Sequence, residues 1–314
     1  HVVINLLKLS CPVVILDNFS NSSKKVYERI RKISNKTCII IEGDISDRDT
    51  LKNIFRKYYI KGVIHLAAFK AVGESEILPI KYYRNNVNGS LILFEEMDIA
   101  KVKTIVFSSS ATVYGINNKS IFKETDFTEP CNVYGRTKLI IENLLKDIYK
   151  SSQDWKVVIL RYFNPIGAHP SGLIGENPLD FPNNLLPFIA QVAFGKREEL
   201  LVFGDDYPTE DGTGKRDYIH VSDLADAHCK ALNYLFENDS IYSIFNLGSG
   251  KAYSVLEVLK IFEAVSGKLI PYRIIDRRPG DIAESIADPS KAQKILKWEA
   301  KLDLYRMCED TWRW

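Results

Sequence analysis

The sequence predicts an α/β fold built on a parallel sheet, because short apolar runs alternate with segments of helical length. The runs are rich in β-branched residues and continuously apolar, which suits strands that are covered on both faces. They span residues 12–17, 37–42, 62–68, 104–110 and 156–163. The helical segments between them span residues 23–34, 47–59, 79–100 and 133–149. Alternation of this kind predicts a doubly wound, Rossmann-like sheet.

The pattern changes after residue 164. Residues 165–187 are rich in Pro, Gly and Asn, so we expect a long loop there, on the substrate side of the fold. Helices are then expected at residues 184–195, 222–237, 254–266 and 289–296, and strands at residues 200–203, 243–246 and 271–275. We therefore expect a first domain of residues 1–164. Residues 165–314 should form a smaller mixed α/β domain, with some segments returning to the first.

Composition excludes several classes of function. The chain of 314 residues has a formal net charge of +2 and a pI near 8.1, so it lacks the basic excess of nucleic-acid-binding proteins. No apolar run approaches the ~18 residues of a membrane span, and the first residues, HVVINLLKL, do not resemble a signal peptide. The five cysteines are scattered, and the five histidines form no cluster. We expect no disulfide scaffold, no metal site and a cytoplasmic location.

Asp17 closes the strand expected at residues 12–17. At the end of the second strand of a dinucleotide-binding βαβ unit, an acid binds the ribose hydroxyls and selects NAD over NADP. The glycine-rich turn of such a unit lies about 20 residues earlier, which here falls before His1. We therefore expect the first strand and its turn to be absent from this chain, and residues 1–8 to remain from the first helix. Taken alone, Asp17 fits a simple turn acid equally well.

Tyr134 and Lys138 are four residues apart at the start of an expected helix, so they share one helical face. A cation beside a phenol lowers its pKa and makes tyrosine a usable general acid and base. Ser110 ends an expected strand, at the sheet edge where ligands bind in open α/β sheets. By itself the Y-x-x-x-K spacing more often marks a half-exposed tyrosine and a surface lysine.

Several longer motifs extend through the whole chain. They are LDNFSNS (16–22), EGDI (42–45), KAVGES (70–75), NNVNGS (85–90), FSSSATVYG (107–115), RYFNPIGAHPSG (161–172), PNNLLPFIAQVA (182–193), DYPTEDGTGKRDYIHV (206–221), NLGSG (246–250) and RRPGD (277–281). With these motifs the sequence resembles the UDP-glucose 4-epimerases (UDP-galactose 4-epimerases), a family of extended short-chain dehydrogenases/reductases, over essentially its whole length.

The resemblance implies a role for each matching residue. Tyr134 would be the catalytic base, Lys138 its pKa-lowering partner and nicotinamide-ribose anchor, and Ser110 the hydroxyl that assists proton movement. The residues that would bind NAD are Asp17, Asn18, Asp44, Ile45, Ala67, Lys70, Asn85, Tyr134, Lys138 and Tyr162. The residues that would bind the UDP-sugar are Lys70, Ser110, Tyr134, Asn164, Asn184, Phe203, Arg216, Tyr218, Arg278, Asp281 and Ser285. A homodimer is also implied, formed by the helices expected at residues 79–100 and 133–149.

The implied reaction interconverts UDP-glucose and UDP-galactose in galactose metabolism. A hydride passes from C4 of the sugar to tightly bound NAD, the 4-keto sugar turns over about its diphosphate, and the hydride returns. Residues 1–164 would bind NAD and residues 165–314 the UDP-sugar. Ser285, a small residue where related enzymes use tyrosine as a gate, implies that N-acetylated UDP-sugars are also accepted. A plain packing role for Ser285 remains the alternative.

Other readings stay open. Another nucleotide-sugar enzyme of the same superfamily, a decarboxylase, dehydratase or reductase, would carry similar motifs. A dehydratase needs an acid pair beside its serine or threonine, and Ala111 and Thr112 occupy those positions. A non-catalytic binder or inactive fragment is the third reading, because without its glycine-rich turn the chain would lack the backbone donors for a pyrophosphate. Arg216 and Arg278 would, without their motifs, fit surface ion pairs as well.

Overall fold

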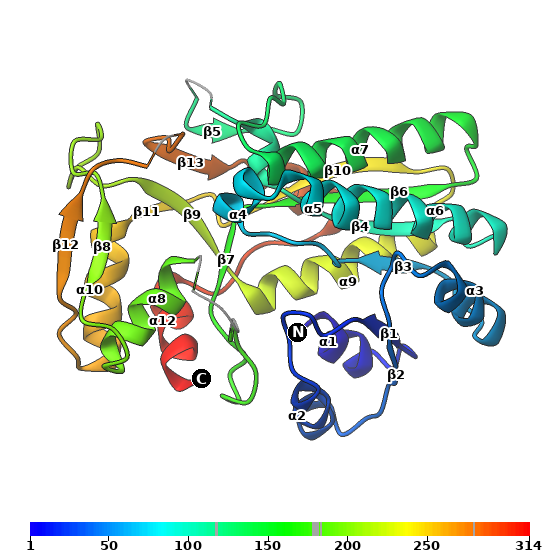
Figure 1. The fold of residues 1–314 in the computed structure, drawn as a ribbon, viewed down its shortest axis with the longest axis horizontal. Coiled ribbons are helices and arrows are strands. Elements are labelled where there is room, and N and C mark those ends of the chain that lie inside the picture. The colour runs from blue at the N-terminus through cyan, green and yellow to red at the C-terminus, as the bar shows by residue number, and fades with distance from the viewer. Residues whose placement is uncertain (117–118, 178–181, 183, 279) are drawn as a thin grey trace.

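The structure, a computed structural model, describes residues 1–116, 119–177, 182, 184–278 and 280–314. It confirms the α/β prediction: a parallel sheet crosses the molecule and helices cover both of its faces (Figure 1). Four parallel strands form this sheet in the order β10 (Tyr242–Leu247), β6 (Lys156–Tyr162), β4 (Thr104–Ser110) and β3 (Val63–His65). Two further parallel strands, β1 (Val14–Asp17) and β2 (Ile39–Glu42), pair with each other as a separate sheet.

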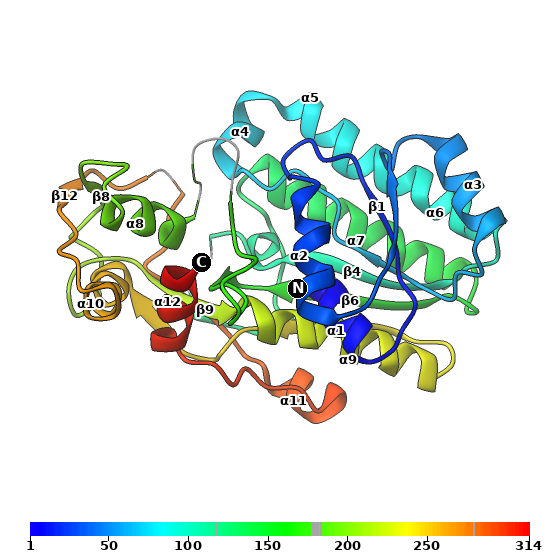
Figure 2. The ribbon, with the colours of Figure 1, turned by 90° about the horizontal axis from the view of Figure 1, so that it is seen from below.

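The burial of the central strands explains their continuous apolar sequence. Along β4 the side chains of Ile105 and Phe107 pack on one face, against α6 (Gly89–Ile99) and α7 (Val133–Ser151). Val106 packs on the other face, against α9 (Val221–Glu237). Successive side chains of a strand point to opposite faces, so a strand covered on both sides needs apolar residues at every position. Figure 2 shows α7 and α9 with the sheet strands β4 and β6 between them.

The amino-terminal helices are those that the sequence predicts. They are α1 (Val2–Lys8), α2 (Lys25–Ser34) and α3 (Arg48–Lys57). Asp47 caps α3 by accepting hydrogen bonds from the backbone N–H groups of Asp49 and Thr50, as acids at this position commonly do. The buried face of α1, with Ile4, packs in a small cluster that includes Ile30 of α2.

The helix expected at residues 79–100 is interrupted. It consists of α5 (Pro79–Tyr82), the π-helical turn η1 (Tyr83–Asn88) and α6, and it is preceded by α4 (Val72–Ile77), which we did not expect. Asn86, fully buried in this turn, accepts a hydrogen bond from the N–H of Phe69 and donates one to its carbonyl. Such π-helical turns often mark functional sites. This one lies between α5 and α6, and Asn86 ties it to the loop after β3.

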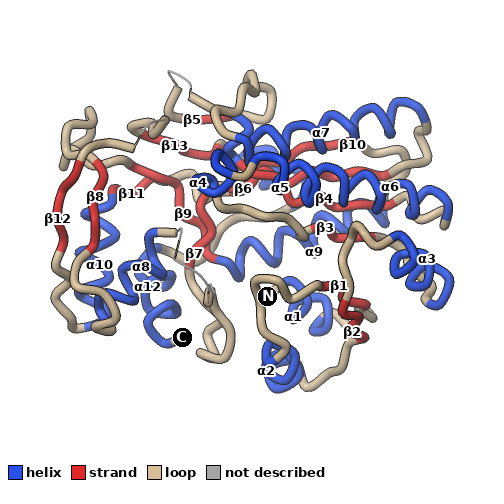
Figure 3. Tube along the Cα trace, viewed as in Figure 1, coloured by secondary structure: helices blue, strands red, loops and turns tan. Residues whose placement is uncertain are grey.

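Strands drawn from residues 121–287 build a mixed sheet that the sequence does not reveal. Its order is β11 (Ala252–Ser254), β9 (Lys215–His220), β13 (Glu284–Ala287) and β5 (Ile121–Phe122), with β7 (Asn164–Ile166) also paired to β9. The expected strands β8 (Leu200–Phe203) and β12 (Tyr272–Ile275) pair in parallel beside it. Figure 3 shows these strands at the end of the molecule that also holds α8 (Leu185–Ala193), α10 (Val255–Ser266) and the unexpected α12 (Leu304–Arg313).

The remaining elements are α11 (Ser290–Leu296), which matches its prediction, and the short 3₁₀ turn η2 (Ala111–Tyr114). The expected loop at 165–187 contains part of β7, and its residues 178–181 and 183 lie outside the described residues, as does residue 279 of the RRPGD motif. The division of the chain at residue 164 stays a prediction. α9 and β10 come from beyond it, yet β10 joins the central sheet and α9 covers it.

The described residues also bear on three expectations from composition. All five cysteines are free thiols. No helix in the described part of the chain combines the length and the apolar character that crossing a membrane requires. Within the same residues, no group of three or more His, Cys, Asp or Glu side chains could hold a metal ion.

The packing of α9 on the sheet predicts a contrast between two neighbouring side chains. Leu235 is fully buried against the sheet, whereas Phe236 beside it is 45% exposed. We expect Leu235→Ala to lower the free energy of unfolding by about 2–5 kcal/mol, because it removes buried methyl groups and leaves a cavity. Urea unfolding measures this, and Phe236→Ala, the matched control, should change stability much less. Equal losses in both variants would contradict the described packing.

Candidate active site

Ser110, Tyr134 and Lys138 lie together at the carboxyl edge of the central sheet. Ser110 is the last residue of β4, and Tyr134 and Lys138 occupy the first two turns of α7. Asn132 fixes the start of that helix by accepting a hydrogen bond of 2.8 Å from the N–H of Gly135. Tyr134 and Lys138 are only 7% and 2% exposed, and the Ser110 hydroxyl hydrogen bonds to the Tyr134 phenol. The structure thus brings the three predicted catalytic residues into one buried cluster.

The burial of Tyr134 has an electrostatic effect opposite to the predicted one. Burial raises the pKa of the phenol to about 12, and the hydrogen bond with Ser110 offsets this only in part. Burial also lowers the pKa of Lys138 to about 7, and its Nζ lies 5.9 Å from the centre of the Tyr134 ring. Burial therefore dominates the pKa of the phenol, and the lowering effect of Lys138 stays a prediction. The four-residue spacing shows the shared face, but not the loss of solvent.

Lys138 is held by the strand below it. Its Nζ donates a hydrogen bond of 2.8 Å to the backbone carbonyl of Ser108 and lies 4.9 Å from the centre of the Phe107 ring. The hydroxyl of Ser108 is bonded at 2.7 Å to Nε2 of His228 on α9, whose Nδ1 contacts the Leu224 carbonyl. The lysine is therefore anchored to a strand that is itself fixed to the helix on the opposite face of the sheet.

The residues predicted to bind adenosine gather at the ends of β1 and β2. Asn18 donates a hydrogen bond of 2.7 Å to Asp44, and Asp17 accepts one of 2.8 Å from the N–H of Phe19. Burial acts to raise the pKa of Asp44, but hydrogen bonds from Ser46 and Asn18 outweigh it and hold that pKa below its ordinary value. Ile45 is buried. The group offers carboxylates for ribose hydroxyls beside an apolar surface suited to an adenine ring.

Four further predicted cofactor residues follow β3 or end β6. Ala67 and Lys70 lie exposed in the loop after β3. Asn85 is half-buried in η1 and donates a hydrogen bond of 2.9 Å to the side chain of Asn86. Tyr162 ends β6 in register with Ser110, and burial raises the pKa of its phenol. These residues extend from the residues predicted to bind adenosine toward Tyr134 and Lys138, along the carboxyl edge of the sheet.

Five of the residues predicted to hold the UDP-sugar form a second group around β9 and β13: Phe203, Arg216, Arg278, Asp281 and Ser285. Asp281 accepts hydrogen bonds from Arg216 at 3.2 Å and from Arg278 at 2.9 Å. The Arg278 guanidinium also lies 4.7 Å from the centre of the Phe203 ring, a cation–π contact. Ser285 lies opposite Arg216 in the register of the two strands. Forked guanidinium donors suit diphosphate oxygens.

The other predicted substrate residues differ in their surroundings. Tyr218, two residues beyond Arg216, is buried on the same face of β9, and burial raises the pKa of its phenol to about 12. Asn164 is exposed on β7. Lys70 and Asn184 meet through one carboxylate: Oε1 of Glu176 accepts hydrogen bonds from both, at 3.0 and 2.7 Å. We did not predict Glu176, which lies in an irregular segment with no periodicity to identify it.

A second unpredicted feature is a buried polar network beneath Lys138. Glu142, one turn further along α7, accepts a hydrogen bond of 2.5 Å from Ser109 and a bidentate contact from Arg161, with the closest N–O distance at 2.6 Å. Both charged side chains are less than 5% exposed. An acid on the buried face of a helix, four residues after a candidate catalytic lysine, was the available sequence signal.

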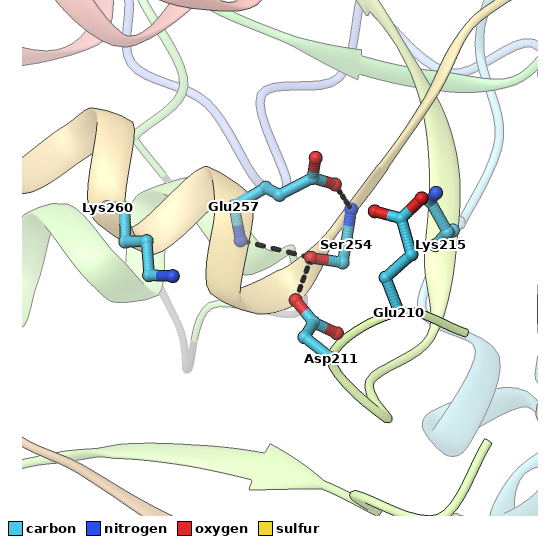
Figure 4. A pocket seen from close by; sticks show the side chains of 6 residues that line it. All are labelled: Glu210, Asp211, Lys215, Ser254, Glu257 and Lys260. Carbon is cyan, nitrogen blue, oxygen red and sulfur yellow. Dashed lines mark hydrogen bonds between the residues drawn. The ribbon is translucent and has the colours of Figure 1, made fainter. Parts of the chain in front are cut away.

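One cavity of about 160 Å³ lies apart from this cluster (Figure 4). Ser254, which caps α10, is hydrogen bonded there to Asp211 and to the N–H of Glu257. The cavity is lined by Glu210, Asp211, Lys215, Ser254, Glu257 and Lys260. Because neighbouring residues of a strand point to opposite faces, Lys215 faces this cavity while Arg216 faces Asp281. The cavity therefore shares β9 with the substrate group but opens on its other side.

Comparison with known proteins gives one consistent result. Residues 1–311 match the family described as GDP-mannose 4,6 dehydratase. The UDP-glucose 4-epimerase of Bacillus subtilis (strain 168) is 52% identical, and the match covers all of this chain and 92% of that protein. That of Neisseria gonorrhoeae is also 52% identical, over the whole of this chain and 93% of the relative.

Solved structures agree with these relatives. The UDP-glucose 4-epimerase of Stenotrophomonas maltophila, solved with NAD and formylated UDP-arabinopyranose, superposes with a TM-score of 0.97 at 47% identity, covering all of this chain and 93% of the other. The enzyme of Bifidobacterium longum, solved with NAD⁺ and UDP, gives 0.96 at 45% identity with the same coverage. Over its whole length, this chain belongs to the UDP-glucose 4-epimerase family of the extended short-chain dehydrogenases/reductases.

Proposed function

We propose that this chain interconverts UDP-glucose and UDP-galactose by transient oxidation at C4 of the sugar, with NAD kept bound. The observation that carries the proposal is the buried cluster of Ser110, Tyr134 and Lys138 at the carboxyl edge of the sheet. A ribose-binding set lies on one side of it and paired arginines on the other, as a dinucleotide and a nucleotide-sugar require. Because the cofactor ends each cycle as it began, the protein needs no pathway for its exchange.

Proton movement is the task of the cluster. Tyr134 takes the proton from the sugar 4-hydroxyl and later returns it, and the Ser110 hydroxyl, bonded to the phenol, assists the transfer. NAD, held by the ribose-binding residues Asp17 and Asn18 and by Lys138, would supply the hydride acceptor and donor for C4. Since burial holds the Tyr134 proton tightly, a positive charge close to the phenol is needed to stabilise its phenolate. Lys138 supplies a charge on the same helical face.

Binding is divided between two sets of residues, which we assign to a cofactor domain of residues 1–164 and a sugar-nucleotide domain of residues 165–314. The cofactor set is Asp17, Asn18, Asp44, Ile45, Ala67, Lys70, Asn85, Tyr134, Lys138 and Tyr162. The sugar-nucleotide set is Lys70, Ser110, Tyr134, Asn164, Asn184, Phe203, Arg216, Tyr218, Arg278, Asp281 and Ser285. Arg216 and Arg278 suit the diphosphate, and Asp281, which already accepts from both, suits a ribose hydroxyl as well.

Elimination of water fits the site less well than epimerisation does, although the family that residues 1–311 match is described as GDP-mannose 4,6 dehydratase. Loss of a hydroxyl needs an acid beside the leaving oxygen. The residues after Ser110 are Ala111 and Thr112, and the Thr112 hydroxyl is bonded to Ser110 at 3.0 Å. Neither side chain can donate a proton as a carboxylic acid does, so a cycle that ends in the same redox state is the better fit.

We also propose that the protein is a cytoplasmic homodimer. α6 and α7 each present a large apolar residue to solvent: Leu91 and Ile140 are both 39% exposed. Exposed apolar side chains on two adjacent helices suit a dimer interface in which two helices of each protomer pack against the same two helices of its partner. The exposed free thiol of Cys131 suits a reducing compartment.

Product analysis tests the proposed reaction. UDP-glucose incubated with the protein should yield UDP-galactose of unchanged mass and no net NADH, whereas loss of water or CO₂ would identify a dehydratase or a decarboxylase. Tyr134→Phe keeps the buried ring but removes the hydroxyl that carries the proton, so kcat should fall by about 10²–10⁴-fold. UDP binding, measured by calorimetry, should persist in this variant. Full turnover by Tyr134→Phe would contradict the assignment of the base.

The size of Ser285 predicts the range of sugars. Ser285 is half-buried on β13, opposite Arg216, so a larger side chain there would enter the space next to the UDP-binding group. Ser285→Tyr should abolish turnover of UDP-N-acetylgalactosamine and spare UDP-galactose, because its ring excludes the N-acetyl group. Ser285→Ala, the matched control, should retain both activities. An unchanged ratio of the two activities in the tyrosine variant would refute the gate.

A further inference from the structure

The Lys138 ammonium is a buried charge in neutral surroundings. From β3, His65 faces it, and burial together with the positive charge of Lys138 lowers the pKa of that imidazole to about 3. His228, which holds Ser108 from α9, has its pKa lowered to about 4 by burial. The phenols of Tyr134 and Tyr162 have pKa values raised by burial. At neutral pH all four side chains are therefore uncharged, and none of them stabilises an ammonium by charge.

Glu142 is the carboxylate that can. It lies four residues after Lys138 on α7, so both side chains are on the same buried face of the helix. Its negative charge acts to raise the pKa of Lys138, against the effect of burial. In the described ion pairs Glu142 is bound by Arg161 rather than by Lys138, and Ser109 donates to the same carboxylate. The lysine therefore gains from this charge while its Nζ remains on the Ser108 carbonyl.

We propose that Glu142 is a positioning residue for the reaction: fixed by Ser109 and Arg161, its buried carboxylate keeps the Lys138 ammonium charged beneath Tyr134. The inference rests on the proposed function, because Lys138 matters only if Tyr134 is the base. Arg161 and Ser109 are adjacent in the register of β6 and β4, so the two strands that form the sheet edge also hold the carboxylate. A direct Glu142–Lys138 contact would instead draw the ammonium away from the ligand side.

The sign of the effect follows from the charges. Neutralising Glu142 removes attraction for the ammonium but not for the neutral amine, so the pKa of Lys138 must fall below its value of about 7. At an effective dielectric constant near 20 this interaction is worth on the order of one pH unit or more. Catalysis that needs the charged lysine would then be retained only at lower pH.

The test is a direct titration of Lys138. Protein labelled with ¹⁵N-lysine is titrated by NMR, with the Lys138 signal identified by its loss in Lys138→Arg. We expect the midpoint in Glu142→Gln to lie about one pH unit below that of the wild type. Glu142→Asp keeps the charge, so its midpoint should lie close to that of the wild type. In the complete NAD-loaded enzyme, the limb of the kcat–pH profile that follows Lys138 should move in the same direction. The NMR titration needs no turnover, so it distinguishes this inference from failure of the proposed reaction.

A matched control is available in α6. Glu96 is 1% exposed and also binds an arginine, Arg48, at 2.6 Å, so Glu96→Gln disrupts a comparable pair without changing the charge beside Lys138. Its Lys138 midpoint should be unchanged. If Glu142→Gln fails to fold because Arg161 is left unpaired, the double variant Glu142→Gln/Arg161→Met removes both charges. Its midpoint should fall by less than about one pH unit, because loss of the Arg161 charge acts in the opposite direction, but it should still fall, since Glu142 is the charge that acts on Lys138. A midpoint unchanged or raised in the folded variant overturns the proposal.

Discussion

The parallel pairing of β4 with β6 is the constraint on which the candidate site depends. In register, Ser109 lies beside Arg161 and Ser110 beside Tyr162, so both strands end at the same level. The polar residues that follow the apolar strands are therefore brought to one edge of the sheet. In open α/β sheets, ligands bind at this carboxyl edge. α7 crosses above this edge and adds its own polar residues from the first two turns. A shift of one residue in the pairing would turn Ser110 to the other face of the sheet.

Burial at this edge removes water from the two catalytic side chains, and this loss of hydration also serves the proposed chemistry. The phenol of Tyr134 and the ammonium of Lys138 have both lost water, which moves their pKa values in opposite directions. In a medium of low dielectric constant each added charge has a larger effect than it would in water. The proton on Tyr134 is thus held firmly in the protein alone and responds strongly to positive charge brought close to it. A solvent-exposed pair with the same spacing would respond weakly.

Much of the fold was predictable because it depends on local pattern. Continuous apolar runs identified β3, β4 and β6 of the central sheet, β10 was expected as a short strand of the second domain, and the four-residue spacing of Tyr134 and Lys138 placed them on one face. The strands β5, β7, β9, β11 and β13 were missed because most of their pairing partners lie far away in the sequence, and all but β9 have only two to four residues, too few to show a period. The burial that raises the pKa of Tyr134 could not be predicted from the spacing for a related reason, since burial is a property of the assembled structure. The partners of Glu176 and Glu142 likewise become visible only after folding.

The distribution of charge separates the two tasks of the proposed site. On the sugar-nucleotide side, one carboxylate, Asp281, faces two guanidinium groups, so a net positive charge remains to hold a diphosphate firmly. Around Tyr134 the neighbouring side chains described above are neutral, apart from Lys138 and the ion pair of Glu142 and Arg161 beneath it. A sugar that must present first one face and then the other cannot be bound by strong, directional contacts on both. Firm binding of the diphosphate with weak binding of the sugar is the division that such a turnover requires, and these two groups of residues have that character.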